Sequence, residues 1–255
     1  ATIPKEELRR IQEQKIFKKG EYPKLDAIMK EIEGQKDNLI HDLVGHLDEN
    51  WSMDKKLQWV LDNKAVTVMS REYMGHVSGS KDKKPAKLDA WQNVYLKYQP
   101  PETKYRDTEG EKARPKYPTA NAILKKYEEV VPIANYSILV KDSVIHRHTG
   151  PENRRGHHLR VHIPLHIPKG DIFLEVNGTE VDWSDSFGFN NQYTHSAHNY
   201  SFEHRLILLI DFDRRYLGIP AGLHYDKMQD KKMQQLLLCF IQCDNAIPSV
   251  SILMP

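Results

Sequence analysis

The sequence predicts a mainly β protein, an antiparallel sandwich or jelly roll with a helical N-terminal region and one C-terminal helix. From about residue 120, after one short helix, extended segments follow one another without intervening helices up to residue 212. The dipeptide Asn177-Gly178 between two of these segments is a strong signal for a tight hairpin turn. Longer runs of apolar residues at helical spacing occur before residue 70 and within 226–243. The composition, 39% hydrophobic and 28% charged among 255 residues, is that of a globular protein.

Residues 1–118 are predicted to form a helical and loop-rich region that packs on a core formed by residues 119–255. Helical spacing relates the apolar residues Leu25, Ile28, Met29, Ile32, Leu39, Ile40, Leu43, Val44 and Leu47. Gly34 predicts a break between two helices. The polar segment 78–88 predicts a loop. Segment 99–118 is rich in proline and charge, which predicts either a solvated loop or a lid that faces the substrate.

The core is predicted to begin with a short helix at 119–130. Its strands are predicted at residues 135–141, 157–167, 171–176 and 204–212. The last helix, 226–243, carries both cysteines, Cys239 and Cys243. Their i, i+4 spacing favours buried core thiols over a disulfide framework. Two cysteines cannot by themselves make a four-ligand zinc site.

Charge and hydropathy narrow the expected partners and compartment. The net charge is +2, and because a dedicated nucleic-acid binder would be more basic, we expect a small-molecule or peptide partner and no nucleic acid. No apolar run approaches the roughly 20 residues that cross a membrane, so no transmembrane segment is predicted. The first residues show no signal peptide, which favours the cytoplasm; the alternative is the secretory pathway or ER lumen, with a signal or anchor removed. Of the N-x-S/T sequons at Asn135, Asn177 and Asn199, only Asn177 is predicted to lie in an exposed turn.

Histidine is concentrated in the β region, where nine of the thirteen histidines lie between residues 146 and 204. Imidazole is a common ligand of transition metals, so this cluster indicates a metal site. Alternation along LRVHIPLH (159–166) places apolar residues on one face of a strand and Arg160 and His162 on the other. A face that carries Arg beside His favours the lining of a carboxylate-binding cavity over a solvent face, which would more typically carry Lys, Glu and Thr.

Arg205 begins the strongly apolar strand RLILLID, in which it shares a face with Ile207, Leu209 and Asp211. An arginine in this position needs a partner, because a buried unpaired charge is costly. His195 lies ten residues before Arg205, with turn-forming residues between them. We therefore expect the two residues on neighbouring antiparallel strands, around a cavity that holds a metal near His195 and an anion near Arg205.

A series of short elements follows in a fixed order: Ser137 in YSILV, HTGP at 148–151, RVH at 160–162, FNNQYTH at 189–195, and Arg205. Each is weak alone, and together at this spacing they resemble the aspartyl/asparaginyl β-hydroxylase family of Fe(II)/2-oxoglutarate oxygenases. The resemblance covers residues 119–217, under half of the chain. It implies a double-stranded β-helix core, a relative of the jelly roll, with Fe(II) as the metal and 2-oxoglutarate and O2 as cosubstrates.

The resemblance also implies roles in binding and reaction. Arg205 with Ser137 would hold the distal carboxylate of 2-oxoglutarate. Arg160 and His162 would be catalytic residues that line the site near the oxalyl end of 2-oxoglutarate or near the substrate. The implied reaction hydroxylates a C–H bond of an amino acid, a peptidyl Asp or Asn, or a related substrate, and yields succinate and carbon dioxide.

On the metal side, the resemblance implies that His148 and His195 ligate Fe(II). Most enzymes of the wider class add a carboxylate two residues after the first histidine, and here that position is Gly150, so the resemblance implies water in that place. Asn191 stands where the family commonly has an aspartate, and it could hydrogen-bond a metal-bound water. Asp142 and Asp185 are minor candidates for a metal carboxylate.

Other residues and other functions stay open. Four further histidines of the region could support the site from behind, but surface or structural roles are favoured for them: His146, His157, His158 and His198. Asp211 is expected either to pair with an arginine or to end its strand. One alternative function is a cupin-like metalloenzyme without 2-oxoglutarate, which would have no use for a distal-carboxylate site at Arg205. The other is a non-catalytic jelly-roll binding protein, which would not need His148 and His195.

Overall fold

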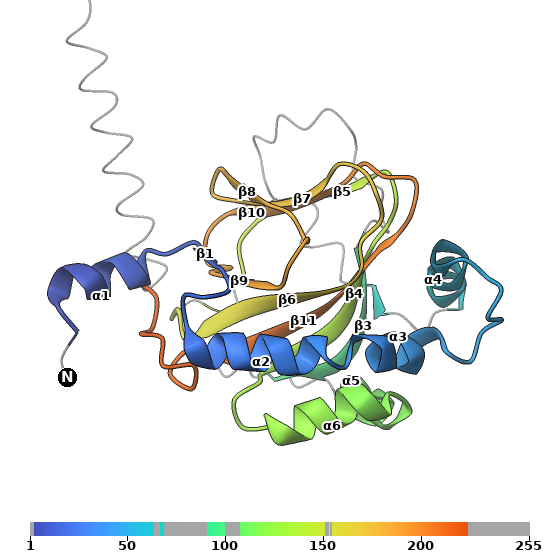
Figure 1. Cartoon of the computed structure of the whole chain (residues 1–255), viewed down its shortest axis with the longest axis horizontal. Coiled ribbons are helices and arrows are strands. Elements are labelled where there is room, and N and C mark those ends of the chain that lie inside the picture. Colours follow the sequence, from blue (N-terminus) through green and yellow to red (C-terminus); the bar gives the residue numbers. More distant parts are fainter. Residues whose placement is uncertain are drawn as a thin grey trace, which may run out of the picture.

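The computed structural model describes residues 3–63, 67–68, 91–99, 108–150, 153 and 155–223. Two antiparallel sheets form the predicted double-stranded β-helix (Figure 1). The larger has the strand order β1-β9-β6-β11-β4-β3-β2, and the smaller has the order β5-β10-β7-β8. The strands are β1 (Ile16–Phe17), β2 (Thr67–Val68), β3 (Trp91–Tyr98), β4 (Ile133–Leu139), β5 (Ser143–His148), β6 (His158–His166), β7 (Ile172–Val176), β8 (Thr179–Val181), β9 (Phe187–Phe189), β10 (His195–Asn199) and β11 (Arg205–Asp213).

Helices cover the outer face of the larger sheet (Figure 1). The helical elements are α1 (Lys5–Gln12), α2 (Pro23–Glu33), α3 (Lys36–Val44), α4 (Met53–Asp62), α5 (Thr108–Ala113), the 3-10 helix Arg114–Lys116 and α6 (Pro118–Lys126). Helix α2 ends before Gly34 and α3 starts two residues later, so the predicted break between two helices is confirmed. The side chain of Asp42 in α3 accepts a hydrogen bond of 2.7 Å from the backbone N–H of Thr119, which ties the N-terminal helices to the start of α6.

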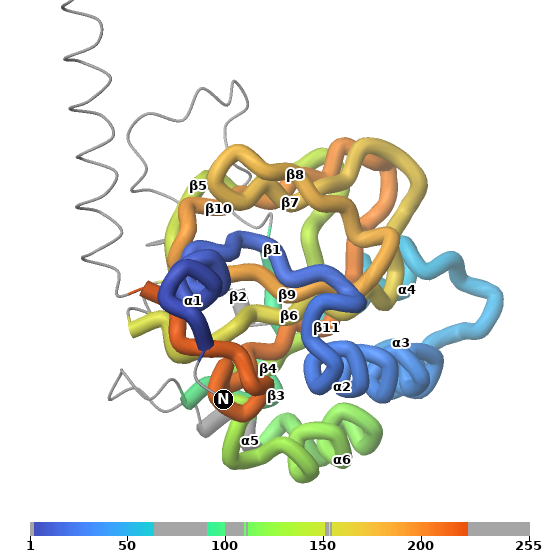
Figure 2. The backbone as a smooth tube through the Cα atoms, turned by 60° about the vertical axis from the view of Figure 1, so that its left-hand side comes forward, coloured from blue at the N-terminus to red at the C-terminus, as the bar shows by residue number. Residues whose placement is uncertain are grey.

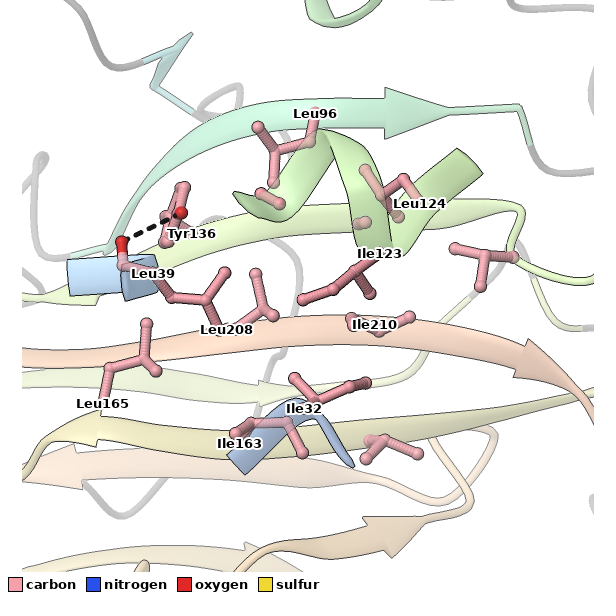
Figure 3. Packing of buried hydrophobic residues seen from close by; sticks show 14 of the residues in the cluster. Ile32, Leu39, Leu96, Ile123, Leu124, Tyr136, Ile163, Leu165, Leu208 and Ile210 are labelled. Carbon is pink, nitrogen blue, oxygen red and sulfur yellow. Dashed lines mark hydrogen bonds between the residues drawn. The ribbon is translucent and has the colours of Figure 1, made fainter. Parts of the chain in front are cut away.

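Two apolar cores lie on the two faces of the larger sheet. The core beneath the helices takes alternate residues of β6 and β11: Leu159, Val161, Ile163, Leu165, Leu206, Leu208, Ile210 and Phe212. Figure 3 shows Leu208 and Ile210 in this layer, where the Tyr136 hydroxyl also donates to the Leu39 carbonyl oxygen at 3.0 Å. The second core lies between the sheets and contains Ile207 and Leu209 of β11. The alternation predicted for both strands is therefore confirmed, and it leaves Arg160, His162 and Arg205 on the inner face.

The segment from 99 to 118 differs from the predicted loop, because its second half is helical. Helix α5 and the 3-10 helix fill residues 108–116, and α6 begins at Pro118. Gly110 is buried so close to β3 that an added Cβ would lie 3.3 Å from the Tyr95 carbonyl oxygen. A glycine thus lets this helix pack directly on the strand backbone, a tertiary contact that proline and charge content do not reveal. Strand β3 itself, unforeseen in the sequence, pairs along its length with β4.

The remaining structural predictions concern a loop, the last helix, membrane spans, a hairpin turn and the sequons. The predicted loop 78–88 and the predicted helix 226–243, with both cysteines, lie outside the described residues. In the part of the chain that the structure describes, no helix is both long and apolar enough to cross a membrane. At the β7–β8 turn, Asn177 has φ +48° and Gly178 has φ +77°, the left-handed pair that a tight hairpin turn requires. Asn177 is exposed, whereas Asn135 and Asn199 are 3% and 0% exposed, as expected for the three sequons.

The expected pairing of the strands that carry His195 and Arg205 is wrong. Strand β10 belongs to the smaller sheet and β11 to the larger one, and Figure 2 shows β10 in one layer with β5, β7 and β8, apart from β6, β9 and β11. The connection is a corner rather than a hairpin, because the Asn199 side chain donates to the backbone oxygens of Leu139 (3.1 Å) and Glu203 (3.0 Å). These bonds turn the chain from one sheet to the other.

Candidate active site

A cavity lies between the two sheets and is lined by both. Its walls are Trp91, Ser137, Ile145, His148, Arg160, His162, Leu174, Phe189, His195, Ala197, Arg205 and Leu209. All six residues that the sequence singled out for metal or cosubstrate are among them. The centre of a water molecule could occupy about 20 Å³ of this cavity. The total empty volume, including the part that opens to solvent, is about 330 Å³. The site is therefore a narrow hollow with polar groups on an otherwise apolar lining.

His148 and His195 face each other across two strands of the smaller sheet. His148 ends β5, His195 begins β10, and the two are direct cross-strand partners with ring centroids 4.2 Å apart. Nδ1 of His148 donates to the backbone oxygen of His146 at 2.7 Å, and Nδ1 of His195 donates to that of Tyr193 at 2.8 Å. A carbonyl oxygen only accepts, so each neutral ring carries its proton on Nδ1 and has its lone pair on Nε2. Backbone acceptors behind the rings are typical of metal-binding histidines.

The electrostatics keep both rings neutral. Burial lowers the pKa of His148 to about 4, and the Arg160 cation acts in the same direction. Burial, together with the neighbouring His148, also lowers the pKa of His195 well below its ordinary value. At neutral pH both imidazoles are therefore uncharged, with an Nδ1 proton and an Nε2 lone pair, which is the form that binds a metal ion.

Arg205 is a buried cation that has no carboxylate partner among the residues that the structure describes. It is 1% exposed, and its Nη2 donates to the Ser137 hydroxyl at 3.2 Å. Its guanidinium carbon lies 4.7 Å from the centre of the Trp183 ring, and its Nε has no hydrogen-bond partner. Burial lowers the pKa of Arg205 to about 9, so the side chain still carries its charge at neutral pH. A buried guanidinium with open donors is prepared to receive an anion.

His162 adds a second open donor to the same cavity. Its Nδ1 accepts a hydrogen bond from the indole N–H of Trp183 at 3.2 Å. The neutral ring must then carry its proton on Nε2, and this buried atom has no partner. Burial lowers the pKa of His162 well below its ordinary value, and the cations of Arg205 and Arg160 add to this effect. The ring therefore stays neutral and offers an N–H to the cavity.

Arg160 differs from Arg205 because it has an acid beside it. Its Nε and Nη2 donate to the two carboxylate oxygens of Asp211 at 2.8 and 2.9 Å, and both side chains are buried. Of the two roles left open for Asp211, pairing with an arginine is the one observed. The carboxylate occupies one edge of the guanidinium, so any contact of Arg160 with a ligand must use its other N–H groups.

The loop after His148 is held by backbone and amide contacts. The Gly150 N–H donates to the backbone oxygen of Asn191 at 2.7 Å. The side-chain oxygen of Asn191 accepts from Nδ2 of Asn153, also at 2.7 Å. That oxygen is therefore engaged within the loop, which does not favour the expected contact with a metal-bound water.

The two minor carboxylate candidates lie elsewhere. Asp185 forms an ion pair with Lys19, and Asp142 occupies the turn between β4 and β5 with φ +49°. Neither lines the cavity. Among the described residues, no group of three or more His, Cys, Asp or Glu side chains could hold a metal ion together.

Of the other histidines, none lines the cavity: His146, His157, His158 and His198 all lie outside it. His198 stacks on Phe173 with centroids 4.5 Å apart and makes hydrogen bonds with Ser196 and Tyr200, a structural role. Sequence reasoning missed Trp91 and Trp183, which touch the site from β3 and from the loop after β8. The sequence offered one local signal for them. A tryptophan in or beside a buried strand usually donates its indole N–H to a nearby polar group, and here these groups are Ser137 and His162.

The residues present fit a metal and a dicarboxylate in one cavity. The two neutral imidazoles of His148 and His195 carry their lone pairs on Nε2, and nitrogen donors of this kind suit iron and related metals. Arg205 and His162 present buried N–H groups that have no acceptor among the described residues. The fold and the site together define a double-stranded β-helix protein whose inner cavity is lined by neutral histidines and buried arginines.

Comparison with known proteins agrees with this class. A profile of the family described as aspartyl/asparaginyl beta-hydroxylase matches residues 58–215, so the chain belongs to this family of hydroxylases, as the motifs indicated. The match begins well before residue 119 and therefore includes α4 and β3. A search of curated proteins finds no match.

Solved structures with detectable similarity include a prolyl-4-hydroxylase from Pseudomonas putida, with 10% identity and a TM-score of 0.35 over 82% of this chain and 97% of that one. An oxidoreductase of the 2OG-Fe(II) oxygenase family from Burkholderia pseudomallei has 10% identity and a TM-score of 0.32, over 53% of this chain and 69% of that one. A Cupin 2 conserved barrel domain protein from Salinispora arenicola has 12% identity and a TM-score of 0.25, over 34% and 66% respectively.

Proposed function

We propose that the protein is an Fe(II)- and 2-oxoglutarate-dependent hydroxylase that acts on an amino acid, a peptidyl Asp or Asn, or a related substrate. One observation carries the proposal: a pair of neutral histidines and a buried arginine without an acid line the same cavity. A metalloenzyme that did not use an acidic cosubstrate would have no use for the second feature. Membership of the family supports the substrate class.

His148 and His195 would hold the iron through Nε2. Their Nδ1–H groups donate to backbone oxygens, which fixes both ring orientations before any metal arrives. Trp91 and Phe189 pack beside these rings, at centroid distances of 6.0 Å from His148 and 5.1 Å from His195. The aromatic rings limit rotation of the imidazoles and keep bulk water away from them.

Arg205 and Ser137 would hold the distal carboxylate of 2-oxoglutarate, and His162 would donate its Nε2–H to the same bound anion. The Ser137 hydroxyl already accepts from Arg205 at 3.2 Å and from the Trp91 indole at 2.7 Å, so its own proton remains available for a carboxylate oxygen. Arg160, held by Asp211, would line the reaction site. When bound, Fe(II) with 2-oxoglutarate and O2 would supply the oxidising chemistry that hydroxylates a C–H bond and releases succinate and carbon dioxide.

The test is a turnover assay on the purified chain with Fe(II), 2-oxoglutarate, O2 and peptides that contain Asp or Asn. We expect succinate to form only when iron and 2-oxoglutarate are both present, and faster with an accepted peptide. Tight iron binding without any effect of 2-oxoglutarate would instead support a cupin-like metalloenzyme. Failure to bind iron at all would support a non-catalytic binding protein.

A further inference from the structure

Trp183 is the side chain that connects the two open donors of the cavity. It lies in the loop between β8 and β9 and is buried in the core between the sheets. Its neighbours on the loop face outward: the Asp182 carboxylate accepts from the Ser184 N–H at 2.9 Å, and Asp185 pairs with Lys19. This outer anchoring holds the loop so that Trp183 points into the core.

The first contact fixes the proton of His162. An indole N–H can only donate, so the 3.2 Å bond from Trp183 makes Nδ1 of His162 the acceptor. The proton of the neutral ring is thereby placed on Nε2, which is buried and has no hydrogen-bond partner in the described part of the structure. The two rings lie nearly parallel, 20° apart with centroids at 6.0 Å, so packing also limits rotation of the imidazole.

The second contact supports Arg205. The same indole ring lies 4.7 Å from the guanidinium carbon, within the range where the electron-rich face of tryptophan attracts a cation. An aromatic face stabilises the charge without taking up a carboxylate-binding edge, whereas an Asp or Glu at this place would compete with an incoming anion. Arg205 therefore stays charged and open.

We propose that Trp183 is a positioning residue that prepares His162 and Arg205 together as an anion clamp for 2-oxoglutarate. The proposal rests on the proposed function and deepens it. It assigns His162 as a hydrogen-bond donor to the bound anion, because its Nδ1 lone pair is already used and its Nε2 carries the proton. It also makes the loop after β8 part of the cosubstrate site, although no metal or cosubstrate ligand comes from that loop.

The binding test compares Trp183→Phe with Trp59→Phe, which removes an indole that packs beside His46, outside the cavity. 2-Oxoglutarate and Fe(II) affinities are measured separately, without oxygen, in the 255-residue chain. Trp183→Phe keeps a ring under Arg205 but loses the N–H, so we expect 2-oxoglutarate affinity to fall about threefold to tenfold, the worth of one ordinary hydrogen bond. Iron affinity should be unchanged in both variants, and 2-oxoglutarate affinity should be unchanged in Trp59→Phe. Wild-type 2-oxoglutarate affinity in Trp183→Phe would overturn the proposal.

The second measurement does not depend on 2-oxoglutarate. Nitrogen-15 NMR of the metal-free protein reports which ring nitrogen of His162 carries the proton. We expect the Nε2–H form alone in the wild type and a mixture of forms in Trp183→Phe. A wild-type ring protonated on Nδ1 would overturn the assignment. If the wild type does not bind 2-oxoglutarate, the proposed function fails, and the tautomer result still decides whether Trp183 sets the proton of His162.

Discussion

Two buried arginines line the same cavity, and their surroundings are opposite. Arg160 on β6 is matched edge to edge by the Asp211 carboxylate, at 2.8 and 2.9 Å. Within the described part of the chain, Arg205 at the start of β11 contacts the Ser137 hydroxyl and the aromatic face of Trp183, and its Nε has no hydrogen-bond partner there. Both guanidinium groups have lost their hydration to burial, but the protein itself compensates only one of them.

The difference separates a structural charge from a functional one. A buried ion pair holds its members in place, and removing one member leaves the other uncompensated. A buried cation without a counter-ion lowers stability in the free protein and is tolerated where a ligand supplies the anion. On this reasoning Arg160 with Asp211 shapes the cavity wall, and we propose that Arg205 binds the anionic cosubstrate.

The largest effect on activity is expected from substitution of His148 and His195. Both side chains are neutral, so their loss should affect iron binding rather than the balance of buried charge. His148→Ala and His195→Ala should each abolish Fe(II)-dependent turnover and weaken iron binding by at least about a hundredfold, because even groups behind metal ligands contribute ten- to a hundredfold. The metal-free variants should remain folded, since no buried charge is left unpaired. Iron titration and a thermal melt measure the two effects. Wild-type-like turnover of either variant would remove that residue from the ligand set.

Breaking the compensated arginine should cost the most stability. Asp211→Asn removes the negative charge that pairs with the buried Arg160 guanidinium, so the free energy of unfolding should fall by about 3–5 kcal/mol. Urea denaturation of the metal-free protein measures it. The matched control is the double variant Arg160→Met with Asp211→Leu, which removes both charges and should recover most of the loss. An unchanged midpoint for Asp211→Asn would mean that the pair does not compensate Arg160.

Substitution of the uncompensated arginine, Arg205, should change the free energy of unfolding in the opposite direction. Arg205→Met removes an unpaired buried charge and keeps most of the volume, so the free energy of unfolding should rise by about 1–2 kcal/mol. The same urea experiment measures it, with wild type and Asp211→Asn in parallel. A loss of more than about 1 kcal/mol would show that Arg205 has a structural role like that of Arg160.

The smallest effect on stability is expected for the exposed ion pair of Arg147 and Glu175, which serves as a reference for the buried pair. Nη2 of Arg147 contacts both carboxylate oxygens of Glu175 at 2.7 Å, as closely as in the buried pair, but the Arg147 side chain is 49% exposed. Glu175→Gln should therefore change the free energy of unfolding by only about 0–1 kcal/mol. Urea denaturation measures this change. In about 1 M salt the difference in unfolding free energy between wild type and Glu175→Gln should disappear, because charges are then screened within about 3 Å. A cost similar to that of Asp211→Asn would show that burial is not what separates the two pairs.

Local patterns were sufficient to predict the two-sheet fold and the inner faces. Alternation along β6 and β11 placed Arg160, His162 and Arg205 on one side, and the structure puts all three in the cavity. The hairpin at Asn177 followed from a turn preference that depends on two residues alone. Features of this kind depend on residues that are close together in the sequence, so a single amino-acid sequence is enough to predict them.

Long-range contacts could not be predicted. A ten-residue spacing between His195 and Arg205 fits a hairpin and a corner equally well, and only the tertiary bonds of Asn199 select the corner. Asp211 could be assigned no partner until β6 was known to lie beside β11. Trp183 reaches the site from a loop whose place depends on the whole sheet, so its contacts with His162 and Arg205 had no local signature.

The most direct measurement is an anaerobic titration of 2-oxoglutarate into the Fe(II)-loaded protein, followed by visible charge-transfer absorption. Wild type should develop a weak visible band that saturates with 2-oxoglutarate. Charge-assisted hydrogen bonds contribute about 1.5–3 kcal/mol each, so Arg205→Met should need roughly ten- to a hundredfold more 2-oxoglutarate. Arg205→Lys should recover part of the loss, because an ammonium lacks the planar fork, and iron affinity should be equal in all three proteins. Saturation of Arg205→Met at the wild-type concentration would contradict the assignment of the uncompensated arginine as the cosubstrate's anchor.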